Sequence, residues 1–197
     1  MILFTMVMNQ EDTNQPKYRK INIDEVIFRK IADNDIAAFE ELYHLTERSV
    51  YAFALSILKN HEDAMDVLQE TYLRIRGAAH LYKPMGKPLA WIFTITRNLA
   101  MSKLRTYNKT VTIPAEDLED NLYYSYVTDG EDKFVLQAAL KILDLVEREI
   151  ILLHAISGFK HREIADYLGM SLGTVLSKYR RGLSKLQKHL KEQGVQG

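Results

Sequence analysis

Apolar residues recur every three or four positions along most of this 197-residue chain, a spacing that places them on one face of an α-helix. The alternation of apolar and polar residues that marks a β-strand is almost absent. The nine glycines and four prolines cluster where the helical period breaks. The pattern therefore predicts an all-α protein with two small helical domains, at residues 22–108 and 132–192.

The segment between these domains, residues 109–131, has a different composition. The stretch TVTIPAEDLEDNLYYSYVTDGED, which contains it almost entirely, carries seven carboxylates, a proline and a glycine, and no basic residue. Such a composition is typical of an extended, solvated chain. We expect an acidic flexible linker here.

The first 21 residues are predicted to form a disordered tail. Their apolar opening, MILFTMVM, is short, lacks a basic leader and runs directly into polar sequence, so we do not expect a signal peptide. Met1, Met6 and Met8 are all possible starts. Since no uncharged apolar run is long enough to span a bilayer, the expectation is a cytoplasmic protein without membrane insertion.

The formal net charge is zero, but the charges are strongly segregated. Residues 24–70 carry eleven acidic and four basic side chains, whereas residues 71–109 carry eight basic side chains and no acidic one. Residues 176–191 carry six basic side chains and again no acidic one. A single basic helical face is usually just solvated, but two such surfaces on a neutral protein favour a polyanion held at two places. Nucleic acid is the expected ligand.

The stretch GMSLGTVLSKYRRGLSKLQKHL, residues 169–190, predicts a capped, basic helix. Ser171 suits the N-cap, and Gly169 suits a left-handed turn before it. The preceding HREIADYLG predicts a shorter helix with Ile164, Ala165 and Leu168 facing inward. On the longer helix, the predicted apolar face comprises Leu172, Val175, Tyr179, Leu183, Leu186 and Leu190.

A short helix, a tight turn and a longer basic helix form a helix-turn-helix, whose second helix enters the major groove of duplex DNA. The N-terminal part of that helix reads base edges, while Arg181 and Lys185 suit phosphate contacts. The polar side chains opposite the apolar face are the predicted duplex contacts: Ser171, Thr174, Ser177, Lys178, Arg181 and Lys185.

Motifs of enzymes are missing from the sequence. The six histidines show no metal-ligand spacing, and neither a glycine-rich phosphate loop nor a Gly-x-Ser-x-Gly motif occurs. The chain has no cysteine, which excludes disulfides and thiolate metal sites. We therefore expect no catalytic residues, no metal and no cofactor. A helix-turn-helix regulator that binds DNA alone and an adaptor-type interaction protein are the alternatives that the residues leave open.

Three stretches resemble one family of proteins. GFKHREIADYLGMSLGTVLSKYRRGLSKL resembles the C-terminal DNA-binding region of bacterial RNA polymerase sigma factors of the sigma-70 family, in particular the extracytoplasmic-function (ECF) group. AFEELYHLTERSVYAFALSILKNHEDAMDVLQETYLRI resembles the polymerase-binding region, and PLAWIFTITRNLAMSKLR resembles the promoter-melting helix. Lys160 and Leu176 depart from the family pattern, so a promoter preference is not carried over from relatives.

The resemblance implies that this chain binds core RNA polymerase and promoter DNA. An exposed acidic ridge on the helix at 62–80 would then contact the coiled coil of the largest polymerase subunit. The flap of the second-largest subunit and an anti-sigma factor are the further partners it implies. The ridge is predicted to comprise Asp63, Asp66, Gln69, Glu70 and Arg74, opposite a buried stripe of Met65, Leu68, Tyr72, Ile75 and Ala79.

The loop at 83–88 and the helix after it would open the minus-ten element and hold an unstacked base. Capture of a single strand needs a basic groove, a stacking surface and an amide that reads a base edge. Trp91 at the edge of the helix is more often a core anchor than a stacking platform, and Ile92, Ile95 and Leu99 are predicted to face the core. The implied contacts are Tyr82, Lys83, Lys87, Trp91, Arg97 and Asn98.

Overall fold

The computed structural model describes residue 7 and residues 21–84, 86–110 and 130–193, and every regular element among them is a helix. The chain divides into two compact units, one of residues 21–120 and one that contains residues 121–197. The all-α prediction with two helical domains is thus confirmed. Most of the predicted tail and of the predicted linker lies outside the described residues. Val7 of the tail is helical and buried, and the described linker residues 109–110 and 130–131 belong to α5 and α6, so these helices extend two residues into the predicted linker at each end.

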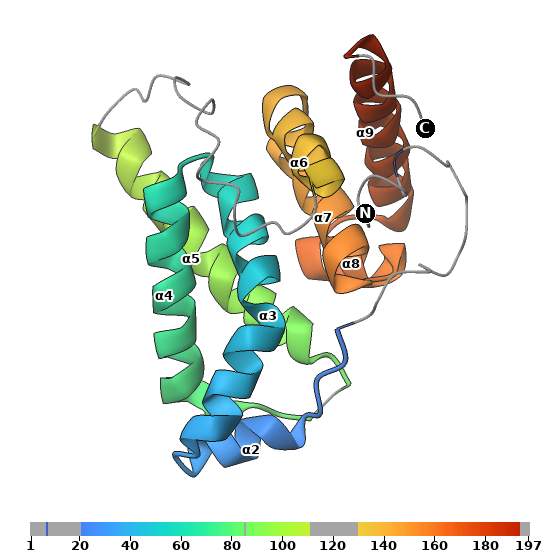
Figure 1. Ribbon diagram of the computed structural model, residues 1–197. Coiled ribbons are helices and arrows are strands. Elements are labelled where there is room, and N and C mark those ends of the chain that lie inside the picture. The colour runs from blue at the N-terminus through green and yellow to red at the C-terminus, as the bar shows by residue number, and fades with distance from the viewer. Residues whose placement is uncertain (1–6, 8–20, 85, 111–129, 194–197) are drawn as a thin grey trace. The chain divides into compact units, whose positions relative to one another are not determined.

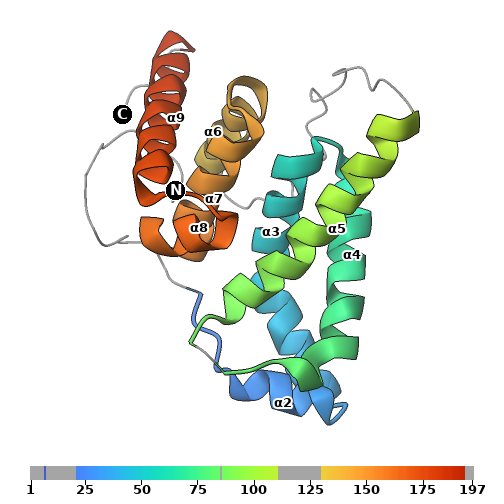
Figure 2. The same cartoon turned by 180° about the vertical axis from the view of Figure 1, so that it is seen from behind.

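The first unit contains helices α2 (Val26–Ala32), α3 (Ile36–Leu58), α4 (His61–Ala78) and α5 (Pro88–Thr110), and a single 3₁₀ turn, η1 (Ala79–Leu81). Helices α3, α4 and α5 pack against one another, and α2 packs against α3, α4 and η1 (Figures 1 and 2). Two side-chain caps define where the long helices begin. Asp35 accepts the backbone N–H of Ala38 at 3.1 Å, and Asn60 accepts that of Asp63 at 2.9 Å.

The buried face of α4 differs from the predicted stripe. Leu68, Tyr72 and Ile75 are buried as predicted, and Ala79 is buried in η1, but Met65 is only half-buried. Because α3 and α5 both cover α4, the buried arc is wider than one stripe and also takes in Ala64, Val67 and Thr71. Thr71 is tolerated there because its hydroxyl donates to the carbonyl of Val67 at 2.7 Å.

Helix α5 begins at Pro88, where the missing N–H costs nothing. Ile92 is buried as predicted, whereas Ile95 and Leu99 are only half-buried. Phe93, Thr96 and Ala100 complete the buried face instead. The buried face is therefore rotated from the predicted one, because α3 and α4 both pack against α5. It includes Thr96, whose hydroxyl donates to the Ile92 carbonyl at 3.0 Å.

The second unit contains α6 (Gly130–Ile142), α7 (Leu145–Ser157), α8 (His161–Leu168) and α9 (Leu172–Glu192). Helix α9 packs against the other three (Figures 1 and 2). Helices α8 and α9 form the predicted helix-turn-helix. At the turn, Gly169 has a left-handed backbone with φ of 65°, and the Ser171 side chain accepts the Thr174 N–H at 3.1 Å, both as predicted.

The apolar face of α9 follows the prediction from Val175 onward. Val175, Leu183, Leu186 and Leu190 are buried. Tyr179 is half-buried, and so is Leu168 on α8. Leu172 is 38% exposed, contrary to the prediction, and Gly173 and Thr174 beside it in the first turn of α9 are exposed as well.

Candidate polymerase and nucleic-acid interfaces

The ridge on α4 is less acidic than the sequence indicates. Lys103 of α5 reaches across to α4, and its ammonium lies 2.8 Å from Asp63 Oδ1 and 2.7 Å from Asp66 Oδ2. Burial alone would lower the pKa of Lys103, but these two hydrogen bonds outweigh it and raise the pKa. The Asp63 side chain is only 13% exposed, so its predicted place on the exposed ridge is wrong. It joins α4 to α5 instead.

The rest of the ridge is accessible. Asp66, Gln69 and Arg74 are exposed and Glu70 is half-buried. Arg74 Nε donates to Glu70 Oε1 at 2.7 Å, the pair expected between residues four apart on a helix. The exposed face thus presents a carboxylate, an amide and a guanidinium in one row along the helix.

One residue of this face was missed in the sequence. Leu73, between Glu70 and Arg74 in the same turns, is 63% exposed. A large apolar side chain on a polar ridge is a common centre of a protein contact. The sequence could have indicated this exposure, because Leu73 lies outside the apolar stripe of α4.

Two of the predicted minus-ten residues form an aromatic cluster with α2. The Tyr82 ring stacks on Phe28 at 4.1 Å between centroids, and Trp91 meets both rings edge-on at 5.3 Å. The Tyr82 hydroxyl also donates to Glu25 Oε1 at 2.6 Å. Both Tyr82 and Trp91 are half-buried. This cluster anchors the loop at residues 82–87 to the domain.

The other four predicted residues lie in the loop and on α5. Lys83 and Lys87 are exposed in the loop, and Gly86 between them has φ of 70°, which suits glycine. Asn98 is exposed on α5, two helical turns after Trp91 and therefore near the same side of the helix. Arg97 is half-buried. The loop and the start of α5 combine positive charge, aromatic rings and an exposed amide.

The polar side of α9 divides into two groups. Ser171, Thr174 and Ser177 are exposed. The hydroxyls of Ser171 and Thr174 bond each other at 2.8 Å, next to the cap. Arg180 is exposed too, and no ion pair to it occurs among the described residues. The sequence prediction omitted Arg180, although a basic side chain in this helix could have been recognised as a DNA contact.

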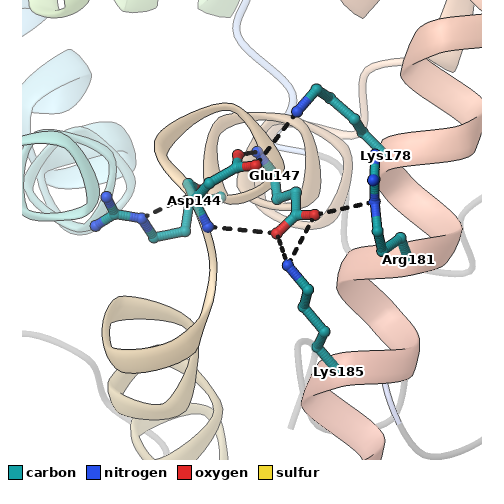
Figure 3. A network of polar contacts seen from close by, with 6 residues as sticks. Asp144, Glu147, Lys178, Arg181 and Lys185 are labelled. Atoms are coloured by element: carbon teal, nitrogen blue, oxygen red, sulfur yellow. Dashed lines mark hydrogen bonds and ion pairs between the residues drawn. The ribbon is translucent and has the colours of Figure 1, made fainter.

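The other group is held by acidic residues of the same unit (Figure 3). Lys178 lies 3.2 Å from Asp144, which caps α7. Arg181 Nε and Lys185 Nζ lie 3.3 and 2.7 Å from the carboxylate of Glu147. Their predicted contact with duplex DNA stays a prediction, since the Arg181 and Lys185 side chains are 56% and 42% exposed beside these carboxylates. They lie along the side of α9 that faces the first turn of α7.

The pKa of Asp144 reflects this arrangement. Burial alone would raise the pKa, but the backbone N–H of Glu147 and the ammonium of Lys178 outweigh it, so the pKa is lowered. Asp144 therefore stays ionised at neutral pH. It serves both as the cap of α7 and as the partner of Lys178.

Within the described part of the chain, no group of three or more histidine, aspartate and glutamate side chains is placed to hold a metal ion. Over the same residues, no helix is both long and apolar enough to cross a membrane.

Comparison with known proteins identifies both units. Residues 42–110 match sigma-70 region 2, and residues 133–186 match sigma-70 region 4. The chain is 32% identical over 162 residues to the ECF RNA polymerase sigma factor SigE of Mycolicibacterium smegmatis, covering 78% of this chain and 62% of SigE. It is 27% identical over 174 residues to the ECF sigma factor SigK of Mycobacterium tuberculosis, covering 83% and 91% of the two chains.

This chain belongs to the ECF group of the sigma-70 family.

Solved structures agree with this assignment. The sigma factor RpoE of Bartonella quintana, in a co-crystal with the anti-sigma factor NepR, is 28% identical, with a TM-score of 0.63 and coverage of 79% of this chain and 98% of that one. CnrH, in complex with the cytosolic domain of CnrY, shares the fold at 23% identity and a TM-score of 0.59.

The matches place the surfaces of this sigma factor in defined regions. Region 2 includes the α4 ridge, the loop at residues 82–87 and α5. Region 4 includes α7, α8 and most of α9. Because both regions match in this order, the findings favour a sigma factor over a regulator that binds DNA without polymerase.

Proposed function

We propose that this sigma factor binds core RNA polymerase through α4 and directs it to promoters through two DNA-binding surfaces. The observation that carries the proposal is the pairing of regions 2 and 4 on one chain, each with an exposed surface of suitable chemistry. The domains at 22–108 and 132–192, joined by residues 109–131, would each engage one promoter element. We further propose that the protein works in the cytoplasm, without catalytic residues, metal or cofactor.

The polymerase contact is proposed to centre on Leu73. An apolar side chain surrounded by Gln69, Glu70 and Arg74 fits the pattern of an interface with an apolar centre and a polar rim. The acidic members, Glu70 and Asp66, would favour a basic surface on the coiled coil of the largest subunit and raise the rate of association. Region 4 would contact the flap of the second-largest subunit.

The minus-ten element is proposed to bind beside the aromatic cluster of Phe28, Tyr82 and Trp91. Lys83 and Lys87 supply positive charge for the backbone of the opened strand, and Asn98 supplies an amide for a base edge. Arg97 adds a guanidinium on the same helix. Tyr82 and Trp91 act first as the anchor of this loop, since their rings already pack on Phe28.

The minus-thirty-five element is proposed to bind the exposed side of α9. Ser171, Thr174, Ser177 and Arg180 form this side, at the N-terminal part of the helix that enters the major groove. Lys178, Arg181 and Lys185 lie along its edge and add to the positive field. An anti-sigma factor is a further proposed partner, because the similar RpoE is found with NepR.

The test is whether the purified protein makes core polymerase initiate at defined sites on bacterial genomic DNA, with RNA 5′ ends mapped against core polymerase alone. We expect new, reproducible start sites that share two sequence elements. Leu73→Ala should weaken binding to core polymerase about tenfold, the loss typical of a central interface residue. Glu41→Lys, at an exposed carboxylate on α3, is the control that should leave binding unchanged. An absence of new start sites with correctly folded protein would refute the proposal.

A further inference from the structure

The buried carboxylate of Glu147 contacts a backbone N–H and two cationic side chains of the DNA-binding domain. Its side chain is 1% exposed, accepts hydrogen bonds from a backbone N–H and the Lys185 ammonium, and forms an ion pair with Arg181 (Figure 3). Oε2 receives the Asp144 N–H at 3.3 Å and Lys185 Nζ at 2.7 Å. Oε1 receives Lys185 Nζ at 3.1 Å and forms an ion pair with Arg181 Nε at 3.3 Å.

The position of this carboxylate is fixed without the help of α9. Glu147 is the third residue of α7 and completes a capping box with Asp144, whose side chain accepts the Glu147 N–H at 2.7 Å. A negative charge in the first turn is also stabilised by the helix dipole. The Glu147 carboxylate is therefore held in place by α7 alone, and the cationic side chains of α9 bind to it.

Close packing of α9 on α7 brings Arg181 and Lys185 near Glu147. Gly182 lies between the two cationic positions on α9, and a Cβ at this residue would lie 2.7 Å from Ile151 Cδ1 and 3.6 Å from Glu147 Cβ. A side chain at this position would require Ile151 Cδ1 to move, so glycine favours the close approach of α9 to α7 at this level. The Arg181 and Lys185 side chains then span the short remaining distance to Glu147.

The carboxylate of Glu147 engages Arg181 Nε and Lys185 Nζ and neutralises part of the positive charge that a DNA phosphate would otherwise attract, while both side chains stay partly exposed. We propose that Glu147 is a positioning residue that withholds Arg181 and Lys185 from phosphate, and so lowers the affinity of this sigma factor for DNA of arbitrary sequence. The proposal deepens the proposed function, because it rests on DNA binding by α9. When phosphate contacts contribute less to the affinity, discrimination between DNA sequences depends more on Ser177, Thr174 and Arg180.

The test compares Glu147→Gln with the wild type in the full-length chain. Glutamine keeps a hydrogen-bonding side chain at the third position of the helix, which a capping box accepts, but it removes the charge that holds the cations. Binding to a short duplex of random sequence is followed by fluorescence anisotropy as the salt concentration is varied. Each new phosphate contact steepens the plot of log K against log salt by about 0.9.

The expected result is tighter binding at low salt and a steeper salt dependence. Between about 50 and about 200 mM salt, the advantage of Glu147→Gln over wild type should shrink roughly 12-fold if both cations are released, and roughly 3.5-fold if one is. Adding Arg181→Ala and Lys185→Ala to this variant should return the slope to the wild-type value or below. An unchanged slope in Glu147→Gln, or a steep slope that survives the loss of both cations, would overturn the proposal.

Glu163→Gln is the matched control, because Glu163 is also the third residue of a helix in the same domain and accepts the backbone N–H of Lys160 at 3.0 Å. It changes the net charge equally, so an equal steepening would attribute the effect to net charge and overturn the proposal. If Glu147→Gln does not fold, the salt dependence of the double variant Arg181→Ala, Lys185→Ala, with Glu147 intact, tests the proposal instead. A slope change below about 0.9 supports the proposal, and one near 1.8 overturns it.

Arg180→Ala separates this inference from the proposed function. If Arg180→Ala weakens duplex binding while Glu147→Gln leaves the slope unchanged, α9 binds DNA and only the role of Glu147 is refuted. If neither variant alters binding to duplex, the assignment of α9 as the DNA-binding helix fails as well.

Discussion

Substitution of Gly182 by alanine has opposite expected effects in two backgrounds. In the helix interior, alanine is more favourable than glycine by about 0.8–1.0 kcal/mol. The new Cβ would lie 2.7 Å from Ile151 Cδ1, and overpacking of this kind costs about 1–3 kcal/mol in a well-packed core. In the wild-type chain, Gly182→Ala should therefore lower the free energy of unfolding of this domain by up to about 2 kcal/mol.

Ile151→Val removes the one atom that clashes. Alone, it should cost about 0.5–1.5 kcal/mol for the lost methyl group. The remaining neighbours of the new Cβ lie at 3.6 and 3.7 Å, which is ordinary contact. In the Ile151→Val background, Gly182→Ala should therefore stabilise the domain by up to about 1 kcal/mol. The two substitutions should couple by at least about 1 kcal/mol.

Native-state hydrogen exchange of the α9 amides in the full-length chain measures this free energy without interference from the first domain. The four members of the cycle are compared at one pH and temperature. If Gly182→Ala has the same effect in both backgrounds to within about 0.3 kcal/mol, the reasoning from the Gly182–Ile151 contact is refuted.

Two further predictions concern pH and promoter opening. Burial lowers the pKa of His154 although its Nδ1–H donates to the Phe159 carbonyl at 2.7 Å, so the unfolded chain takes up a proton at higher pH than the folded one. The second domain should therefore lose stability as the pH falls below about 6.5, and His154→Gln should flatten the dependence of its melting temperature on pH; an unchanged dependence would contradict this. Asn98→Ala should bind core polymerase normally but open a fully paired promoter poorly, since a base partner worth about 1–3 kcal/mol is lost. Thymine reactivity in the minus-ten element, on paired and premelted templates, measures this opening, and wild-type opening of the paired template would reject the assignment of Asn98.

Local features were predicted well because their causes lie within a few residues. Ser171 caps α9 and Gly169 takes a left-handed turn as predicted, since both depend only on the adjacent backbone. Pro88 begins α5 for the same kind of reason. The pair of Glu70 and Arg74 follows from the helical repeat alone.

Burial was predicted less well where more than one helix covers a face. Met65 and Leu99 are apolar and correctly spaced but only half-buried. Thr71 and Thr96 are buried although they are polar, because each hydroxyl bonds a carbonyl of its own helix. A helical wheel shows which residues share a face, but it does not show from which sides neighbouring helices pack. The helical period therefore cannot predict which residues lie at the centre of the buried face.

The amino-acid pattern was enough to predict that this chain is helical, that it has two domains, and that its second domain contains a capped basic helix. These properties depend on period, capping and composition, which are local. Tertiary structure alone decided which charges are accessible. Lys103 meets Asp63, and Lys185 meets Glu147, across 40 and 38 residues of chain respectively. Charge segregation along the sequence cannot reveal such pairs, because the Coulomb interaction depends on distance in space, and only the packing of α5 on α4 and of α9 on α7 sets that distance.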